Sequence, residues 1–441
     1  MTAGDATASR RGGGDPAVGF TDSWYHHTAH SYTPFAALSE SSEADVCIVG
    51  GGYTGLSAAI ELAQNGYRVV VLEAHKVGSG ASGRNGGVLG TGQRKDQDEL
   101  ESWLGKDDAR LMWQIADDAN QLVRDRIKRF GIDCQLRDGE LVVAHKEKYE
   151  QELWDYAQYL EQEYAYPHKR CVTRDEVADM LGNDVYFGGY VDTRAGHIHP
   201  LNLAIGLAQA AERLGVQIHE DSRVTEMHRQ PDGVVMRTRS GQVKARFGIL
   251  GCNGYLGRLD KGMERYQMPI NNFVAATVPL GEEGAKAINR DNLAVVDTRF
   301  VVNYFHNSAD HRLIFGGGEN YSSWFPKDIH AFVRKRMEMV YPQLKGVEIE
   351  FGWGGTLAIT MRRMPHFGRY GDNVYYAQGY SGHGIAMANM GGLLAAQAIM
   401  GQAERFDLFA NLKHQSFPGG RWLRWPGLVA GMLYYSMKDR L

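Results

Sequence analysis

The clearest succession of apolar and polar segments in this 441-residue chain lies between positions 45 and 73. Residues 45–50 (D-V-C-I-V-G) form a short apolar run that is typical of a buried strand. Residues 53–66 carry small and aliphatic side chains at helical spacing, and residues 68–73 (R-V-V-V-L-E) form a second apolar run. The pattern therefore predicts a strand, a helix and a second strand in immediate succession.

The same reasoning predicts further elements along the chain. Helices are expected at residues 106–130, 146–164, 200–214, 326–340 and 385–400. Strands are expected at residues 140–144, 217–219, 223–228, 243–253, 272–280, 293–302, 312–315 and 373–378. Pro200 suits the first turn of its helix, because its missing N–H would have no helical partner there.

Three glycines follow the first strand in the spacing Gly50-x-Gly52-x-x-Gly55, and Tyr53 and Thr54 stand between the last two. The first glycine permits a tight turn, the second lets the backbone approach a pyrophosphate, and the third lets the helix pack closely on the sheet. The helix N-terminus then faces the phosphates. The spacing predicts a dinucleotide site; a glycine turn before an ordinary helix is the alternative.

An acidic residue supports the dinucleotide interpretation. Glu73 ends the second strand, 23 residues after Gly50, and Ala74 follows it. An acid at this point is placed to accept hydrogen bonds from ribose hydroxyls, and it would have no role beside an ordinary glycine turn. It also favours FAD or NAD over NADP, because a carboxylate suits an unphosphorylated ribose.

A glycine-rich segment at residues 78–87 favours FAD over NAD. It contains five glycines and no apolar bulk, so it predicts a loop that wraps an extended anion rather than a core element. FAD is the longer cofactor and needs such a second contact, to which Arg84 would add a positive charge. The residues expected to bind are Ala81, Ser82, Arg84, Asn85, Gly86 and Gly87. A flexible surface loop is the alternative.

A third glycine turn lies near the C-terminus, between the strand at 373–378 and the helix that follows. It consists of Gly379, Tyr380, Ser381, Gly382, His383 and Gly384. A helix N-terminus fed by such a turn carries a partial positive charge. Placed at the pyrimidine end of a flavin, it would stabilise the negative charge of the reduced form. A plain connection between strand and helix is the alternative.

Composition narrows the class of protein. A net charge of −4 gives no support for nucleic-acid binding. Four dispersed cysteines without a CxxC pair favour free thiols in a reducing compartment, which indicates the cytoplasm. Residues 1–23 are expected to be disordered, and the apolar stretch at 425–435 is too short to span a membrane. This composition is compatible with a homo-oligomer.

Several of these motifs together resemble a known family. Residues 80–87, 252–255, 353–355 with Thr360, and 379–384 resemble the FAD-dependent D-amino-acid-oxidase-like (DAO family) amine oxidases, which include sarcosine and glycine oxidases. Within that family the chain is most similar to the gamma-glutamylputrescine oxidoreductase branch, over residues 24–441. The resemblance implies that Val224 meets the adenine, and that further cofactor contacts come from Cys252, Asn253, Gly254 and Gly355.

The resemblance also implies the fold. We expect an α/β plus α+β protein, in which a Rossmann-like FAD-binding domain is interleaved with a mixed-sheet substrate domain. The FAD-binding domain is expected at residues 43–95, 190–258 and 350–400, and the substrate domain at 96–189 and 259–349. Residues 401–441 are expected to form a C-terminal helical tail.

Flavin-dependent amine oxidation asks mainly for orientation and electrostatics, so no catalytic triad is expected. His383 is the candidate catalytic residue, with a hydrogen-bonded histidine at a helix start as the alternative. Tyr380 and Trp353 are candidate substrate walls, and Arg194 is a candidate anchor for a substrate carboxylate. His197 and His199 have metal-like spacing but no neighbouring ligand cluster, so no metal site is expected.

The predicted function is FAD-dependent oxidation of a small-molecule amine, namely a gamma-glutamylated amine, with O2 as acceptor. The chain lacks a second complete GxGxxG motif, so electrons should enter from the substrate itself. No cysteine lies after Cys252, so the FAD should be non-covalent. Arg362, and Arg84 with Asn85, depart from the sarcosine and glycine oxidase pattern. A secondary-amine or N-methyl amino acid oxidase, and a flavin subunit of an electron-transfer complex, remain alternatives.

Overall fold

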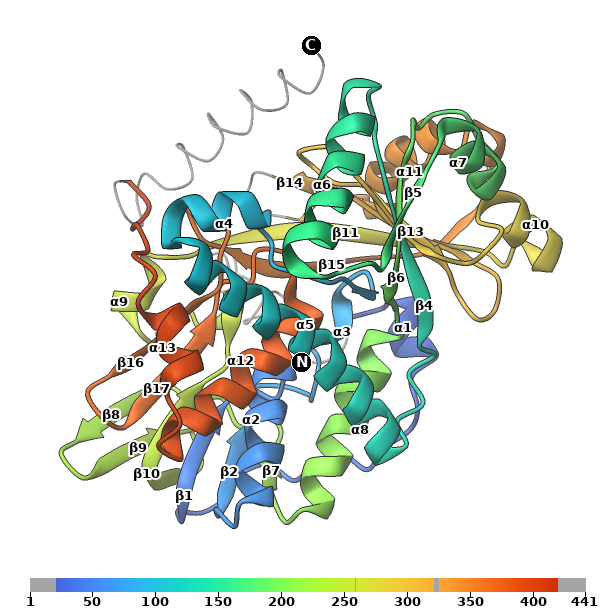
Figure 1. The fold of residues 1–441 in the computed structure, drawn as a ribbon. Coiled ribbons are helices and arrows are strands. Elements are labelled where there is room, and N and C mark those ends of the chain that lie inside the picture. Colours follow the sequence, from blue (N-terminus) through green and yellow to red (C-terminus); the bar gives the residue numbers. More distant parts are fainter. Residues whose placement is uncertain (1–20, 258, 321–324, 419–441) are drawn as a thin grey trace, which may run out of the picture.

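The computed structural model describes residues 21–257, 259–320 and 325–418 (Figure 1). Within these ranges the strands form two sheets, of eight and nine strands. In Figure 1 the eight-stranded sheet and its helices occupy the lower part of the molecule, and the nine-stranded sheet lies above them. This arrangement agrees with the expected Rossmann-like unit combined with a mixed sheet.

The eight-stranded sheet has the order β16-β17-β10-β1-β2-β7, and the hairpin β8-β9 is attached to β10. Its strands are β1 (Ser42–Val49), β2 (Val69–Leu72), β7 (Gln217–His219), β8 (Glu226–Gln230), β9 (Gly233–Arg237), β10 (Gln242–Leu250), β16 (His366–Tyr370) and β17 (Val374–Gln378). Strand β1 runs parallel to both β2 and β10, and its last four residues are buried. Short, continuously apolar strands of this kind are typical of a parallel sheet covered on both faces.

Three buried helices pack on one face of this sheet. They are α2 (Tyr53–Gln64), α8 (Pro200–Arg213) and α12 (Gly384–Ile399), and α2 contacts both of the others. The long helix α5 (Lys106–Phe130) packs against α12 and α8. The side chains of these four helices join those of β1 and β2 in the largest apolar cluster of the described chain.

The nine-stranded sheet has the order β15-β11-β14-β13-β12-β4-β6-β3, and β5 pairs with β6. Its strands are β3 (Val88–Leu89), β4 (Arg137–Val143), β5 (Lys169–Val172), β6 (Gly189–His197), β11 (Met268–Thr277), β12 (Ala294–Asp297), β13 (Tyr304–Asn307), β14 (Leu313–Asn320) and β15 (Ile349–Ile359). Pairing is antiparallel except between β4 and β12.

One face of this second sheet is closed by helices and the other faces a cavity. Leu141 and Val143 of β4 pack in an apolar cluster with α7 (Arg174–Leu181) and α11 (Ile329–Val340). Glu140 and Val142, which alternate with them, line the cavity. Because successive side chains of a strand point to opposite faces, the sequence of β4 assigns one face to the core and the other to the site.

Seven further α-helices lie in the described chain. They are α1 (Trp24–His27), α3 (Ala81–Arg84), α4 (Gln97–Leu104), α6 (Lys148–Tyr164), α9 (Lys261–Glu264), α10 (Gly281–Ile288) and α13 (Glu404–Ala410). In the described ranges, only α12 and α13 taken together are long and apolar enough to cross a membrane, and that pair is bent by 117°. The expected tail at 401–441 is described only as far as residue 418, and the stretch at 425–435 lies outside the described residues, as does most of 1–23.

The sheet boundaries differ from the expected domain boundaries in three places, the first being β3, which lies in the expected segment 43–95 but pairs with β6 of the nine-stranded sheet. The segment 350–400 was expected in the FAD-binding domain, but β15 pairs with β11 along its length and so belongs to the nine-stranded sheet. Strand β6, expected at the start of the segment 190–258, also lies in that sheet. All three strands join the sheet through antiparallel hydrogen bonds to distant segments, which local patterns do not reveal.

Two expected elements are also shorter or different. The strand at 293–302 ends at Asp297, because its carboxylate accepts hydrogen bonds from the backbone N–H groups of Arg299 and Asn303 and so turns the chain. The segment 78–87 is not wholly a loop, since it contains the single helical turn α3. Its small residues allow that turn to pack closely on α8.

Candidate active site

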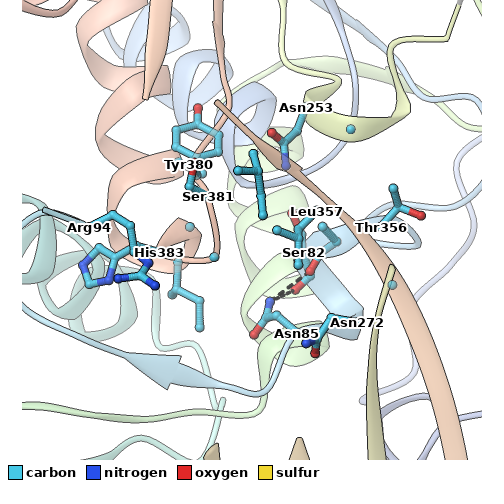
Figure 2. A pocket seen from close by; sticks show the side chains of 18 of the residues that line it. Ser82, Asn85, Arg94, Asn253, Asn272, Thr356, Leu357, Tyr380, Ser381 and His383 are labelled. Atoms are coloured by element: carbon cyan, nitrogen blue, oxygen red, sulfur yellow. Dashed lines mark hydrogen bonds between the residues drawn. The ribbon is translucent and has the colours of Figure 1, made fainter. Parts of the chain in front are cut away.

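A cavity of about 1670 Å³ is lined by residues from both sheets. The first sheet contributes the turns after β1, β2, β10 and β17, and the second contributes β4, β6, β11 and β15. Figure 2 shows residues of both sheets around it, with Asn253, Tyr380 and Ser381 from the first and Asn272, Thr356 and Leu357 from the second. The three glycine-rich segments expected to bind a cofactor all reach this cavity.

The turn after β1 has the close packing that the glycine spacing predicts. Gly50 has φ +112°, a left-handed conformation that favours glycine. A Cβ atom on Gly55 would collide with the carbonyl oxygen of Gly50, so only glycine lets α2 approach the strand this closely. Gly52 is the N-cap residue of α2, and the N–H of Tyr53 donates to Oγ of Ser82 at 3.0 Å. Gly50, Gly52, Tyr53 and Thr54 line the cavity.

The carboxylate of Glu73 is held at the end of β2 by backbone amides. Its Oε2 accepts from the N–H of Gly51 at 2.7 Å, and its Oε1 accepts from the N–H of His75 at 2.9 Å. Burial raises the pKa of Glu73, although these amides oppose the shift. Ala74 and Val224 line the same end of the cavity. A carboxylate fixed in this way can accept hydrogen bonds from hydroxyl groups.

The segment 78–87 is locked by its own side chains. Nδ2 of Asn85 donates to the carbonyl oxygens of Ala81 at 3.0 Å and Ser82 at 2.9 Å, and Figure 2 shows the contact with Ser82. Buried Arg84 donates from Nε to the carbonyl oxygen of Ser79 at 2.6 Å. Gly86 lines the cavity, whereas Gly87 packs behind it against the carbonyl oxygen of Ile198.

The turn after β17 is tied to the turn after β10. The N–H of Gly379 donates to Oδ1 of Asn253 at 2.9 Å. The hydroxyls of Tyr380 and Thr54 share a hydrogen bond of 2.7 Å, which connects this turn to the start of α2. Three glycine turns that are far apart in the sequence are therefore joined at one place. The lining residues of this region also include Cys252, Gly254, Gly355, Ser381, Gly382, His383 and Gly384.

His383 is the N-cap residue of α12 and lies at the cavity beside Arg94 (Figure 2). Burial, together with the nearby positive charge of Arg94, lowers the pKa of His383 to about 4. The imidazole is therefore neutral at neutral pH. Its Nε2 atom is buried and has no hydrogen-bond partner among the described residues. A buried polar atom without a partner at a cavity is an expected contact for a bound group.

Two of the predicted substrate residues lie elsewhere. Trp353 does not line the cavity; it is 1% exposed, stacks edge-on against Tyr25 and donates from Nε1 to the carbonyl oxygen of Arg84 at 3.0 Å. Arg194 also lies outside the cavity lining, because its guanidinium pairs with Asp117 of α5 at 3.3 Å. The structure therefore gives no support to the predicted roles of Trp353 as a substrate wall and of Arg194 as a carboxylate anchor, because both side chains are engaged in contacts outside the cavity lining.

The paired histidines have structural contacts. The side chain of His199 accepts from the N–H of Asn202 and so caps α8, and the ring of His197 stacks on that of His306. Burial lowers the pKa of His199 to about 3. Within the described residues, no group of three or more His, Cys, Asp or Glu side chains is arranged to hold a metal ion.

Sequence reasoning missed several polar residues of the cavity, including Arg94, Glu140, Tyr190, Tyr255, Asn272 and Thr356. The clearest available signal was Glu140, a charged residue at the start of an otherwise apolar strand. Its charged neighbours Lys169 and Asp192 could not be foreseen, because they lie on β5 and β6, where no strand was predicted. Arg94 gave no signal, since it lies in a polar stretch between elements.

The chemistry of the lining fits an extended dinucleotide such as FAD. The glycine turn at the start of α2 leaves room for a phosphate, and the carboxylate of Glu73 suits a ribose. At the other end of the cavity lies the N-terminus of α12. Cys252 lines the cavity as a thiol whose pKa is raised to about 12 by burial. It is therefore not a reactive thiolate.

The chain matches a known protein family along most of its length. Residues 45–398 match the FAD-dependent oxidoreductase (DAO) family. The chain is 42% identical to gamma-glutamylputrescine oxidoreductase of Escherichia coli K12, over 96% of this chain and 99% of that protein. It is 39% identical to the probable oxidoreductase OrdL of Rhizobium meliloti, over 95% and 97%. The crystal structure of glycine oxidase from Geobacillus kaustophilus superposes with a TM-score of 0.69 at 22% identity, over 82% and 95%.

Proposed function

This chain belongs to the DAO family of FAD-dependent oxidoreductases, and from that premise we propose that it oxidises a gamma-glutamylated amine such as gamma-glutamylputrescine. The observation that carries the proposal is the 42% identity to the Escherichia coli enzyme along nearly the whole of both chains. The glycine oxidase fold is shared at 22% identity, which supports a common architecture and leaves the substrate open.

We propose that FAD is held non-covalently along the cavity. The adenosine end would lie at Glu73, Ala74 and Val224, and the pyrophosphate at the start of α2 and at residues 252–254. The flavin end would lie between residues 81–86, Gly355 and the turn 379–384. The neutral thiol of Cys252 supports a non-covalent cofactor, because covalent attachment to sulfur needs a thiolate.

When bound, FAD supplies a hydride acceptor for the carbon next to the amine and passes the electrons on to O2. The protein's own contribution is orientation. The hydrogen bond between Tyr380 and Thr54 fixes the turn that carries His383, and the nine-stranded sheet covers the cavity. His383 would present a neutral imidazole with a free Nε2 to the reacting groups.

The expected products are an aldehyde, ammonia and hydrogen peroxide, after hydrolysis of the imine that hydride loss leaves on the substrate. We propose the cytoplasm as the compartment, and the four free thiols Cys47, Cys134, Cys171 and Cys252 support this proposal.

The test is anaerobic mixing of the purified protein with gamma-glutamylputrescine while the visible flavin band is followed. Rapid bleaching, with colour and peroxide returning on admission of air, is the expected result. A band that is unmoved by this amine but bleached by sarcosine or glycine would overturn the substrate. Bleaching that is reversed by an artificial dye but not by air would overturn O2 as the acceptor.

A further inference from the structure

Two buried carboxylates of the cavity, Asp297 and Glu140, have no part in the proposed function, and Asp297 is satisfied by Asn303 and Arg299, which leaves Glu140 of β4. It is 8% exposed and lines the cavity. Its direct cross-strand neighbour is Asp192 of β6, which in turn is the neighbour of Lys169 on β5. Three charged side chains thus lie in register on one face of the sheet.

These charges are unequally partnered. Asp192 accepts from Nζ of Lys169 at 2.8 Å, from Oγ1 of Thr91 at 2.6 Å and from the hydroxyl of Tyr166 at 3.0 Å. The ammonium group of Lys169 therefore forms its ion pair with Asp192 and not with Glu140. The carboxylate of Glu140 accepts no hydrogen bond from any described residue. Its interactions with Lys169 and Asp192 are electrostatic only. A buried carboxylate in this condition needs a donor from a bound molecule.

Glu140 faces the same point of the cavity as His383. A Cβ atom on Gly90 would lie 2.9 Å from Cε1 of His383 and 3.6 Å from Oε2 of Glu140. The carboxylate on the nine-stranded sheet and the imidazole at the start of α12 therefore meet at Gly90. That point lies at the end of the cavity where the flavin is proposed.

Aromatic rings line the same part of the cavity. Tyr190 precedes Asp192 by two residues on β6 and so shares its face, and Tyr156 of α6 lines the cavity as well. Aromatic faces combined with a carboxylate are the environment that protein sites offer to an alkylammonium group.

We propose that Glu140 binds the ammonium group of the substrate and accepts its proton. The inference rests on the proposed amine oxidation. In the proton step one N–H bond of the ammonium breaks and one O–H bond forms on Glu140. The neutral amine that remains can release hydride from its adjacent carbon. Burial raises the pKa of Glu140 to about 7, with Asp192 adding to the shift and Lys169 opposing it, which suits a group that takes up a proton.

The test compares Glu140→Gln with Glu152→Gln. Glu152 is a matched control, because it lines the same cavity from α6 but is exposed. Binding of n-butylammonium is followed through the shift of the flavin band, with n-butanol as the uncharged probe. Wild type should bind the ammonium and discriminate against the alcohol. Glu140→Gln should weaken ammonium binding roughly 10- to 100-fold, the loss of one charge-assisted hydrogen bond. The control should stay within about twofold of wild type.

A second readout separates a chemical role from a structural one. Besides His383 and Lys169, the titratable groups that face Glu140 are Asp192 and Tyr190. In wild type, kcat/KM for the amine should rise with pH through about 7, as Glu140 ionises. Glu140→Gln should lose this rise, and Glu140→Asp, which keeps the charge, should retain it.

The outcomes are distinct. Ammonium binding by Glu140→Gln within about twofold of wild type, at equal FAD content, would overturn the inference. So would a wild-type flavin band that responds equally to n-butylammonium and n-butanol, a result that needs no variant. Failure of gamma-glutamylputrescine to bleach wild type would count against the proposed substrate, and the n-butylammonium titration would still decide the role of Glu140.

Discussion

At the residue scale, the carboxylates of Asp192, Glu73 and Glu140 have three different surroundings. Asp192 has an ion pair and hydrogen bonds, so its pKa is lowered despite burial. Glu73 has backbone amides, which oppose the effect of burial without cancelling it. Glu140 has no hydrogen-bond donor, and its pKa rises to about 7. A buried carboxylate without a hydrogen-bond donor is not stabilised by core packing alone. The position of Glu140 at the cavity therefore indicates a role in binding.

Glu140→Gln should stabilise the substrate-free protein at neutral and higher pH. The pKa of Glu140 is raised from 4.5 to about 7 in the folded state, so wild type loses stability as pH rises across that window and gains none back above it. The variant should therefore unfold in urea with a free energy higher by about 1–3 kcal/mol at alkaline pH, and equal to wild type at pH 4. Glu152→Gln should show no such gain. If Glu140→Gln and wild type differed in free energy of unfolding by the same amount at acid and at alkaline pH, the unpaired state of Glu140 would be contradicted.

His383→Ala should slow flavin reduction by the amine about tenfold, the usual effect of losing one hydrogen bond to a neutral group. Because the pKa of His383 lies at about 4, the loss should be the same at every pH between 6 and 9. Stopped-flow absorbance would measure it. His414→Ala is the control, since His414 is also a partly buried histidine but contacts the carbonyl oxygen of Pro365 away from the cavity. Unchanged rates of both flavin reduction and reoxidation would exclude a role of His383 in the reaction.

At the element scale, local patterns predicted the strand–helix–strand unit at 45–73 because its signals lie within one short stretch. The three glycine turns were found for the same reason. The sheet that β15 joins could not be predicted, because its partner β11 lies about 80 residues away and pairing depends on tertiary packing. Trp353 is an example: its strand was recognised only as a motif, and its packing against Tyr25 depends on tertiary contacts.

Gly55→Ala tests the close contact between β1 and α2. The added Cβ would collide with the carbonyl oxygen of Gly50, so the helix must move away from the strand that carries the turn. We expect a loss of more than about 2 kcal/mol in the free energy of unfolding and a purified protein with little bound flavin. Urea denaturation and the ratio of absorbance at 450 nm to 280 nm would measure the two effects.

The matched control for that change is Gly284→Ala. Gly284 lies in α10, has no positive φ and does not line the cavity, and an added Cβ would lie 3.2 Å from Cβ of Leu280. Alanine has the higher helix propensity, so the variant should keep full flavin content and lose no more than about 0.5 kcal/mol. Full flavin content in Gly55→Ala as well would show that the turn tolerates displacement.

At the scale of the whole molecule, the cavity is shared by two sheets that are interleaved in the chain. Its lining comes from segments at both ends of the described sequence, from Val49 to Pro418. The contacts that close it, such as Tyr380 with Thr54 and Asn253 with Gly379, join turns that belong to the same sheet but to different parts of the chain. Because residues of both sheets line the cavity, a ligand bound in it contacts both sheets and stabilises them together.

Removal of the cofactor should consequently lower the stability of the entire fold in one step. A ligand that binds only the folded state stabilises it by RT ln(1 + [L]/Kd), which is about 4 kcal/mol when the free ligand is a thousand times Kd. Protein freed of flavin should melt at a lower temperature, and added FAD should restore both the melting temperature and the visible band. Because the cysteine thiol in the cavity is neutral, acid precipitation should leave the flavin in the supernatant. Flavin that stays with the precipitate would mean a covalent bond and would require a different attachment residue. Two separate melting transitions, only one of which responds to FAD, would instead show that the sheets unfold independently.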